Sequence, residues 1–204
     1  TKTITLSPAG TAGNKLIVVA TIFSNTQTLA PTTPASGWTL DLDANPASSG
    51  QRMRWYSLDL VGGETTITFT TSDSPTTHDI GIHAYEVSGL VADSTAADKA
   101  VGSTFSGGVT SKATGTTGTL SQADEIAIAC VMINGSSGGS EAWDSSFNIG
   151  TTNVRSWAAY LIVAATTALN PTASWTTSRS VHAGIVTYKM ASDSTVTPSA
   201  DASW

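Results

Sequence analysis

The chain has 204 residues, of which 40% are apolar and 12% are charged, and its formal net charge is −6. This length and apolar share suffice for a buried core, which excludes an intrinsically disordered chain. Its five lysines and four arginines are scattered along the sequence, so we expect neither nucleic acid nor an anionic membrane surface as a partner.

Strand patterns follow one another through the first 90 residues, without a helical apolar stripe between them. The predicted strands are 3–7, 15–23, 38–42, 52–60, 65–71 and 80–87. Turn-forming residues separate them, and Gly62-Gly63 is a hairpin signal because both glycines can adopt positive φ. The run 15–23 is apolar at successive rather than alternate positions, which predicts a strand covered on both faces.

The second half repeats the order of the first. Thr-Thr-Ser followed by Gly-Ile-x-x-Tyr occurs at 70–85 and again at 176–188. The apolar run that begins at Leu16 corresponds to the run that begins at Ile126. We interpret the repeat as a tandem duplication, with halves at about 3–90 and 117–190.

The connector 91–116 is polar, and weak strands are expected in it around Val101–Phe105 and Val109–Ala113. The predicted fold is all-β: an antiparallel, jelly-roll-like β-sandwich built from two duplicated half-sandwiches, forming one domain over 1–190. Residues 191–204 lack periodicity and are expected to form an extended C-terminal tail. Trp204 at its end is a candidate assembly residue that docks on a partner.

The usual signatures of catalysis are missing from the sequence. It has no Gly-x-Ser-x-Gly motif, and Cys130 lies within an apolar run, where a small buried side chain is expected. The three histidines, His78, His83 and His182, are not equivalent in the two halves, which argues against a shared metal site. No two carboxylates stand out as a pair for glycoside hydrolysis. We therefore expect a protein that is not an enzyme.

Asp41, Asp43 and Asn45 have the opening spacing of a calcium-binding loop. Pro46 stands where such a loop needs glycine, and Arg52 where it needs glutamate, so this is not an EF-hand. A looser site at these three residues remains open, and a structural calcium ion is the one cofactor considered.

Six tryptophans are the remaining candidates for a ligand site. Those at 38, 55, 157 and 175 lie in predicted strands, where aromatic side chains fill a sandwich core. Trp143 lies in the predicted loop EAWDSSFN instead, beside Asp144 and Asn148. These three residues are the candidate ligand-binding site, and an exposed tryptophan there would stack on sugar rings.

Several segments together resemble a known family over about residues 13–190. In the first half they are Gly13–Ala20, Pro34–Leu40, Arg52–Tyr56, Gly62–Phe69 and Tyr85–Leu90 with Asp93, and in the second half Ala123–Ala129 and Trp175–Ser178. The pattern is similar to a β-sandwich module of bacteriophage virion structural, tail-fibre and capsid-associated proteins, also found in secreted bacterial surface proteins. One departure is EAWDSSFN, where the family usually has a Pro-Ala-Gly-Trp or Pro-Ala-Gly-Phe turn.

The resemblance implies a virion structural protein, namely a capsid decoration or an appendage or fibre subunit of a bacteriophage-like particle. The alternative is a carbohydrate- or receptor-binding module of a secreted or surface protein. The expected partners are virion proteins or copies of the chain itself, with host-surface glycans as a further possibility. The expected location is the virion or the extracellular space. Since Thr1 is not an initiator methionine, we expect a processed form or a segment of a longer product.

Overall fold

The computed structural model describes residues 1–24, 26–45, 50–72, 78–104, 106–135, 140–144, 146–152, 155–192 and 198–199, and for residues 151, 198 and 199 only the backbone. All the regular structure in this part of the chain is β-strand. The strands form antiparallel sheets packed on one another, which confirms the expected antiparallel β-sandwich.

Fifteen strands are present in the described residues. They are β1 (Lys2–Thr5), β2 (Lys15–Ile22), β3 (Leu29–Thr33), β4 (Trp38–Ala44), β5 (Arg52–Asp59), β6 (Thr66–Thr71), β7 (Ile80–Val87), β8 (Ala97–Gly102), β9 (Ser106–Ala113), β10 (Glu125–Ile133), β11 (Ala142–Trp143), β12 (Asn148–Thr152), β13 (Ser156–Val163), β14 (Thr172–Lys189) and β15 (Pro198–Ser199). The sequence did not predict β3, because Pro31 interrupts it. Proline is tolerated there because β3 is the edge strand of its sheet.

Two larger sheets form the middle of the molecule, and their strand orders correspond. In the first half the order is β15-β7-β2-β5-β4, and in the second it is β11-β14-β10-β13-β12. The apolar strands β2 and β10 are each paired on both sides and completely buried. Matching β7-β2-β5-β4 to β14-β10-β13-β12 gives the arrangement that a duplicated half-sandwich would have.

The repeated phrase folds differently in the two halves. In the first half it forms two strands in different sheets, with β6 between β1 and β3 and β7 beside β2. In the second half it lies within the single 18-residue strand β14. The first part of β14 pairs with β11 and β9, while its last part pairs with β10 and β8. The connector thus contributes β8 and β9 to the sheet of the second half.

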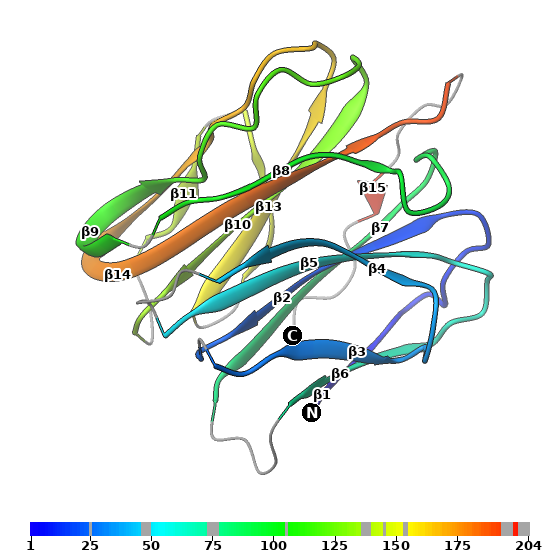
Figure 1. Cartoon of the computed structure of the whole chain (residues 1–204), viewed down its shortest axis with the longest axis horizontal. Coiled ribbons are helices and arrows are strands. Elements are labelled where there is room, and N and C mark those ends of the chain that lie inside the picture. The colour runs from blue at the N-terminus through cyan, green and yellow to red at the C-terminus, as the bar shows by residue number, and fades with distance from the viewer. Residues whose placement is uncertain are drawn as a thin grey trace.

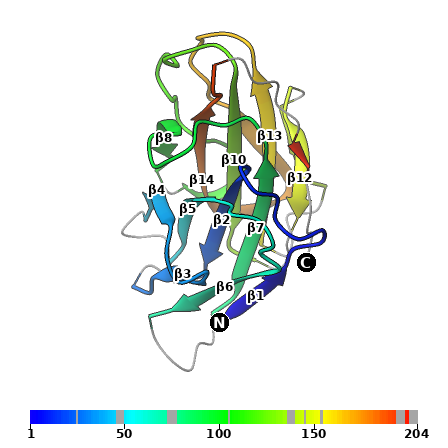
Figure 2. The ribbon, with the colours of Figure 1, turned by 90° about the vertical axis from the view of Figure 1, so that its right-hand side faces the viewer.

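Three apolar cores accompany the three sheets, whose arrangement Figures 1 and 2 show from two sides. The central core lies between the two larger sheets and includes Ile17 and Trp55 from one sheet and Ile128 and Tyr188 from the other. A first outer core lies between β1-β6-β3 and the sheet of β2. A second outer core lies where β14 curves over the far face of β10 and β13, so that Trp175 meets Trp157 edge to face at 5.7 Å.

The predicted equivalence of Leu16 with Ile126 is wrong by one residue. Leu16 faces the first outer core, whereas Ile126 faces the central core. Ile17 lies opposite Tyr85 on β7 just as Ile126 lies opposite Tyr188 on β14. A shift of one residue moves every side chain of a strand to the other face, and a run that is apolar at every position gave no signal to fix it.

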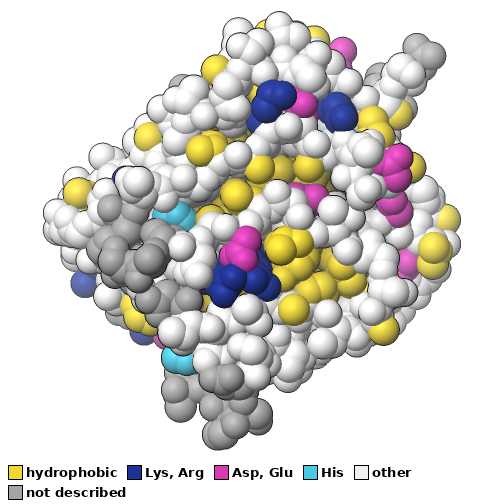
Figure 3. Space-filling view, viewed as in Figure 1, with side chains coloured by type: hydrophobic (Ala, Val, Ile, Leu, Met, Phe, Trp, Pro, Cys, Tyr) yellow, Lys and Arg dark blue, Asp and Glu magenta, His cyan; other side chains and the backbone are white. Residues whose placement is uncertain are grey.

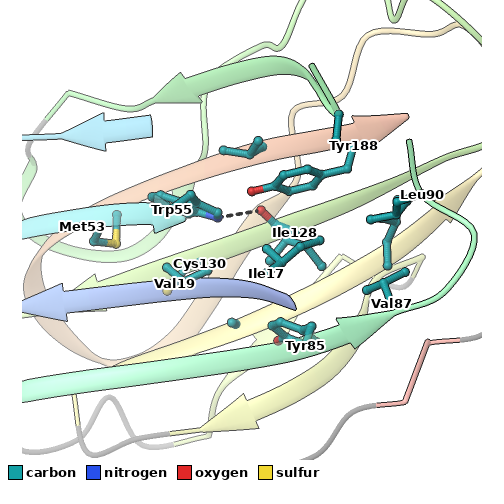
Figure 4. Close-up of a cluster of buried hydrophobic side chains, with 14 of the residues drawn as sticks. Ile17, Val19, Met53, Trp55, Tyr85, Val87, Leu90, Ile128, Cys130 and Tyr188 are labelled. Atoms are coloured by element: carbon teal, nitrogen blue, oxygen red, sulfur yellow. Dashed lines mark hydrogen bonds between the residues drawn. The ribbon is translucent and has the colours of Figure 1, made fainter. Parts of the chain in front are cut away.

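A direct hydrogen bond between the two larger sheets crosses the central core. The indole Nε1 of Trp55 on β5 donates to the carbonyl oxygen of Ile128 on β10, at 3.2 Å (Figure 4). The ring packs over Gly184 of β14, where a Cβ atom would lie 2.8 Å from Cη2 of Trp55. The second Gly-Ile-x-x-Tyr phrase therefore has glycine where the facing sheet inserts a tryptophan.

Candidate functional site

The predicted ligand residue Trp143 is buried rather than exposed. It is 7% exposed, belongs to the second outer core, and its ring centre lies 6.2 Å from that of Phe147. This corrects the expectation of a sugar-stacking ring, because a tryptophan that stacks on a sugar must expose one face of its ring to solvent. The side chain is buried because the short strand β11 pairs with the first part of β14, opposite Ala173.

Asp144 and Asn148 are exposed beside this buried ring. The Asp144 carboxylate accepts a hydrogen bond from the backbone N–H of Thr172 at 2.6 Å, so it fastens the loop to β14. Asp144 also borders a shallow depression of about 170 Å³, together with Phe147, Leu161 and Asn170. Without an exposed aromatic ring, the three predicted residues do not form the binding platform that the sequence suggested.

Asp41 and Asp43 serve opposite faces of their sheet. A β-bulge between Leu40 and Leu42 makes Asp41 an extra residue in β4. The Asp41 carboxylate accepts hydrogen bonds from Tyr188 at 2.9 Å and Ser57 at 3.2 Å, within the space between the two larger sheets. Burial raises its pKa to about 6, although both hydrogen bonds oppose this shift.

Asp43 instead pairs with Arg52 and Arg54. Burial alone would raise the pKa of Asp43, but these guanidinium groups hold it below its ordinary value. Asn45, the third predicted calcium ligand, lines a groove of about 310 Å³ between β4 and β8 with Asp43 and His182. The bulge thus keeps the carboxylates of Asp41 and Asp43 from converging on one ion, which corrects the expectation of a calcium site at these residues. Among the described residues, no three His, Cys, Asp or Glu side chains gather as metal ligands.

Trp204, the predicted assembly residue, lies outside the described residues. The tail is represented by β15, whose Pro198 and Ser199 pair with Val87 and Glu86 of β7. The tail segment thus adds a short strand to the edge of the first-half sheet.

A pocket with both polar and apolar lining, which we call the end pocket, lies at one end of the central core. It has a volume of about 210 Å³ and is lined by Thr21, Asp79, Ile80, Gly81, Met132, Arg155 and Ser156. The ends of β2 and β10 and the starts of β7 and β13 meet here. None of these residues is among the site residues predicted from the sequence.

The floor of the end pocket is a chain of hydrogen bonds inside the apolar core. His83 Nε2 lies 2.8 Å from Ser156 Oγ, and Ser156 Oγ lies 3.3 Å from Thr21 Oγ1. Thr21 in turn donates to the carbonyl oxygen of Gly81 at 3.3 Å. A serine and a histidine at this distance are also the first requirement for nucleophilic catalysis. Here both are almost fully buried, and their contact holds the two sheets together.

The rim of the end pocket carries one charge of each sign. Arg155 Nε donates to Asp79 Oδ2 at 2.8 Å, which links the segments before β13 and β7 across the two sheets. The guanidinium group of Arg155 also lies 5.1 Å from the ring centre of Phe23. This cation–π contact orients the arginine, so the rim presents a fixed donor and a fixed acceptor.

The end pocket lies where the two halves differ. Gly81 and Gly184 are equivalent, because they lie opposite the corresponding positions Thr21 of β2 and Cys130 of β10. Trp55 covers Gly184, whereas Gly81 borders the pocket. The polar His83 likewise corresponds to the apolar Val186 in the second half. This polar substitution within a repeated core strand was the one signal in the sequence for the site.

Two further buried groups, His182 and Cys130, are held in uncharged forms. Burial lowers the pKa of His182 to about 4, so its ring is neutral. Burial also raises the pKa of the Cys130 thiol well above its ordinary value, and keeps it protonated.

Comparison with protein-family models, with curated proteins and with solved structures finds no match for this chain. The family resemblance therefore stays a prediction based on the residues quoted above. Within the described residues, no helix is long and apolar enough to cross a membrane.

Proposed function

We propose that this chain is a non-enzymatic structural subunit of a bacteriophage-like virion, either a capsid decoration or an appendage or fibre subunit. In this proposal it assembles with copies of itself or with other virion proteins through its C-terminal segment. The observation that carries the proposal is the pairing of β15 with the edge of β7. The resemblance to phage structural modules gives the kind of particle.

The edge of β7 suits the addition of a strand. All eight residues of β7 pair with β2 on one side, whereas on the other side, within the part of the chain that the structure describes, β15 pairs with two of them. An open strand edge presents backbone N–H and C=O groups that another chain can satisfy. Because every copy has the same edge and the same tail, reciprocal exchange of tails would give a closed, symmetric assembly.

The surface is compatible with burial in such an assembly. Figure 3 shows few charged side chains on one face, and several of them lie beside a charge of the opposite sign. Arg52 and Arg54, for example, both form ion pairs with Asp43. Removing paired charges from water costs less than removing isolated ones, so contact with a neighbour is not strongly opposed.

The first test is the mass of the particle by light scattering over a concentration series. The full chain is compared with a chain ending at Ser192, which keeps the hydrogen bond from Ala191 N to Gly89 O. We expect a discrete oligomer for the full chain and a monomer of unchanged melting temperature for the shortened one. A full chain that stays monomeric at every concentration, or an oligomer that does not need the tail, would contradict the proposed role of the tail.

A cysteine pair distinguishes a tail bound to its own chain from one bound to a neighbour. Glu86 and Ser199 lie directly opposite each other, at a separation of Cα atoms that suits a disulfide. Under oxidising conditions E86C/S199C should give covalent oligomers on a non-reducing gel if tails are exchanged. Covalent monomers alone would show that each tail stays on its own β7. The single variants E86C and S199C control for random cross-linking.

A further inference from the structure

The end pocket lies where β-sandwiches commonly carry their binding sites. Four chain segments meet there, namely the ends of β2 and β10 and the starts of β7 and β13. Loops at the ends of a rigid sandwich can vary without disturbing the core, which is why binding sites concentrate on them. The location alone suggests a ligand, and the lining residues indicate its chemistry.

We propose that the end pocket binds one pyranose ring of a neutral sugar. Its volume of about 210 Å³ is below the ~300–1,000 Å³ of pockets for drug-sized ligands. A single ring with small substituents therefore fits this site better than an extended ligand. This inference goes beyond the proposed assembly function and does not depend on it.

The polar groups of the end pocket match the hydroxyl groups of a sugar. The Asp79 carboxylate accepts hydrogen bonds, and the Arg155 guanidinium group donates them. The hydroxyl group of Thr21 donates its proton to the carbonyl oxygen of Gly81, so it can accept a hydrogen bond from a ligand. A sugar hydroxyl donates and accepts at once. Because Asp79 and Arg155 balance in charge, the site favours a neutral ligand over an anion or a cation.

Part of the lining of the end pocket is apolar. Ile80 and Met132 contribute to it, and Gly81 presents bare backbone without a side chain. Such a surface suits the face of a pyranose ring that carries only C–H bonds. Polar and apolar lining together would fix the orientation of the ring.

The exposure of these residues determines how deep the ring lies. The side chain of Asp79 is 63% exposed and that of Arg155 is 29% exposed, whereas Thr21 and Ser156 are each 1% exposed. The ring therefore binds at the rim, and one of its hydroxyl groups points toward the floor. A single ring with few hydrogen bonds implies a dissociation constant of about 1 mM.

Saturation-transfer NMR on the full chain tests this inference. The probes are D-glucose, D-galactose, D-mannose and N-acetyl-D-glucosamine, each followed by a titration that gives its dissociation constant. D79N removes the acceptor charge at the rim, and T21V removes a floor hydroxyl while keeping the side-chain shape. D43N is the matched control, because Asp43 is also paired with arginine but lies outside the end pocket.

We expect saturation transfer to at least one of the four sugars. D79N and T21V should each bind that sugar about tenfold more weakly, because each variant weakens or removes one hydrogen bond to the ligand. D43N should bind like the parent chain. The melting temperature of each variant checks that the fold is kept. The inference is overturned if none of the four sugars shows transfer, or if D79N and T21V bind as tightly as D43N. Repeating the titration on the chain that ends at Ser192 separates this result from that of the assembly test.

Discussion

Tyr188 of β14 donates a hydrogen bond to Asp41 of β4 at 2.9 Å, and so connects the two larger sheets at the edge of the central core. The contact exists because a β-bulge turns Asp41 toward the facing sheet. Tyr188 itself is completely buried, and its hydroxyl group would otherwise lack a partner in an apolar environment. The carboxyl group of Asp41 thus supplies the hydrogen-bond acceptor for the Tyr188 hydroxyl group, and it also accepts a hydrogen bond from Ser57.

This contact predicts that the stability of the protein depends on pH through Asp41. The folded-state pKa of about 6 lies above the ordinary value of 3.8, so the folded chain binds this proton more tightly than the unfolded chain. The stabilisation is fully present below about pH 4 and is lost as the pH rises through 6. In urea unfolding, D41N should lack this dependence, which amounts to on the order of 2–3 kcal/mol. Parallel pH profiles for D41N and the parent chain would contradict the assignment.

D43N should change the pH dependence of stability in the opposite direction, so it serves as a control for D41N. Asp43 has a lowered pKa because of Arg52 and Arg54, despite some burial, so its ion pairs stabilise the protein above the ordinary pKa of an aspartate. That contribution disappears as the pH falls below about 4. The two variants should therefore differ from the parent chain at opposite ends of the acidic range.

Gly184→Ala should destabilise the protein by about 1–3 kcal/mol, as expected for overpacking a core. The added Cβ would lie 2.8 Å from Cη2 of Trp55 and 3.2 Å from the carbonyl oxygen of Val101. Gly107→Ala is the matched control, since the nearest atom to its Cβ would be Ser180 Oγ at 3.7 Å. Denaturant unfolding followed by tryptophan fluorescence measures both. Equal stability of the two variants would mean that Trp55 can move away at little cost.

Trp143→Ala should lower the free energy of unfolding by about 3–5 kcal/mol, because it removes a large buried ring. The neighbouring variant Asn148→Ala changes an exposed side chain and should stay within about 0.5 kcal/mol of the parent chain. Calorimetry or denaturant unfolding gives both values. If Trp143→Ala were as stable as the parent chain, the ring would not be part of the second outer core.

Cys130 should not react with a thiol reagent in the folded protein. Its side chain is completely buried in β10, and burial raises the thiol pKa, so neither access nor the thiolate needed for reaction is present. Ellman's reagent at pH 8 should detect no thiol in the folded chain and one thiol per chain in denaturant. Rapid labelling without denaturant would mean that the central core opens readily.

Local patterns of the sequence were sufficient for the all-β class and for most strand positions. Alternating or continuous apolar runs, with glycine and proline between them, favour strands wherever they occur, and β2, β5, β6, β7 and β10 lie close to their predicted positions. The limit was register. Leu16 and Ile17 are both apolar, so nothing in the sequence distinguished the face toward the central core from the face toward the outer core.

The candidate sites depended on tertiary structure even more strongly. The spacing of Asp41 and Asp43 suggested the start of a calcium-binding loop, but a single bulge in β4 separates them onto opposite faces of a sheet. Trp143 looked like a loop residue, because the two-residue strand β11 pairs with the distant β14 and no local sequence pattern indicates that pairing.

The sequence by itself determined which segments become buried strands, since burial of apolar side chains depends on residues a few positions apart. Only the tertiary structure decided which polar side chains meet. Asp79, Ser156 and their neighbours in the end pocket come from four strand ends far apart in the chain, and sheet packing alone brings them together. The same packing placed Trp55 over Gly184 and left Gly81 bordering a pocket, although both glycines belong to the same repeated phrase.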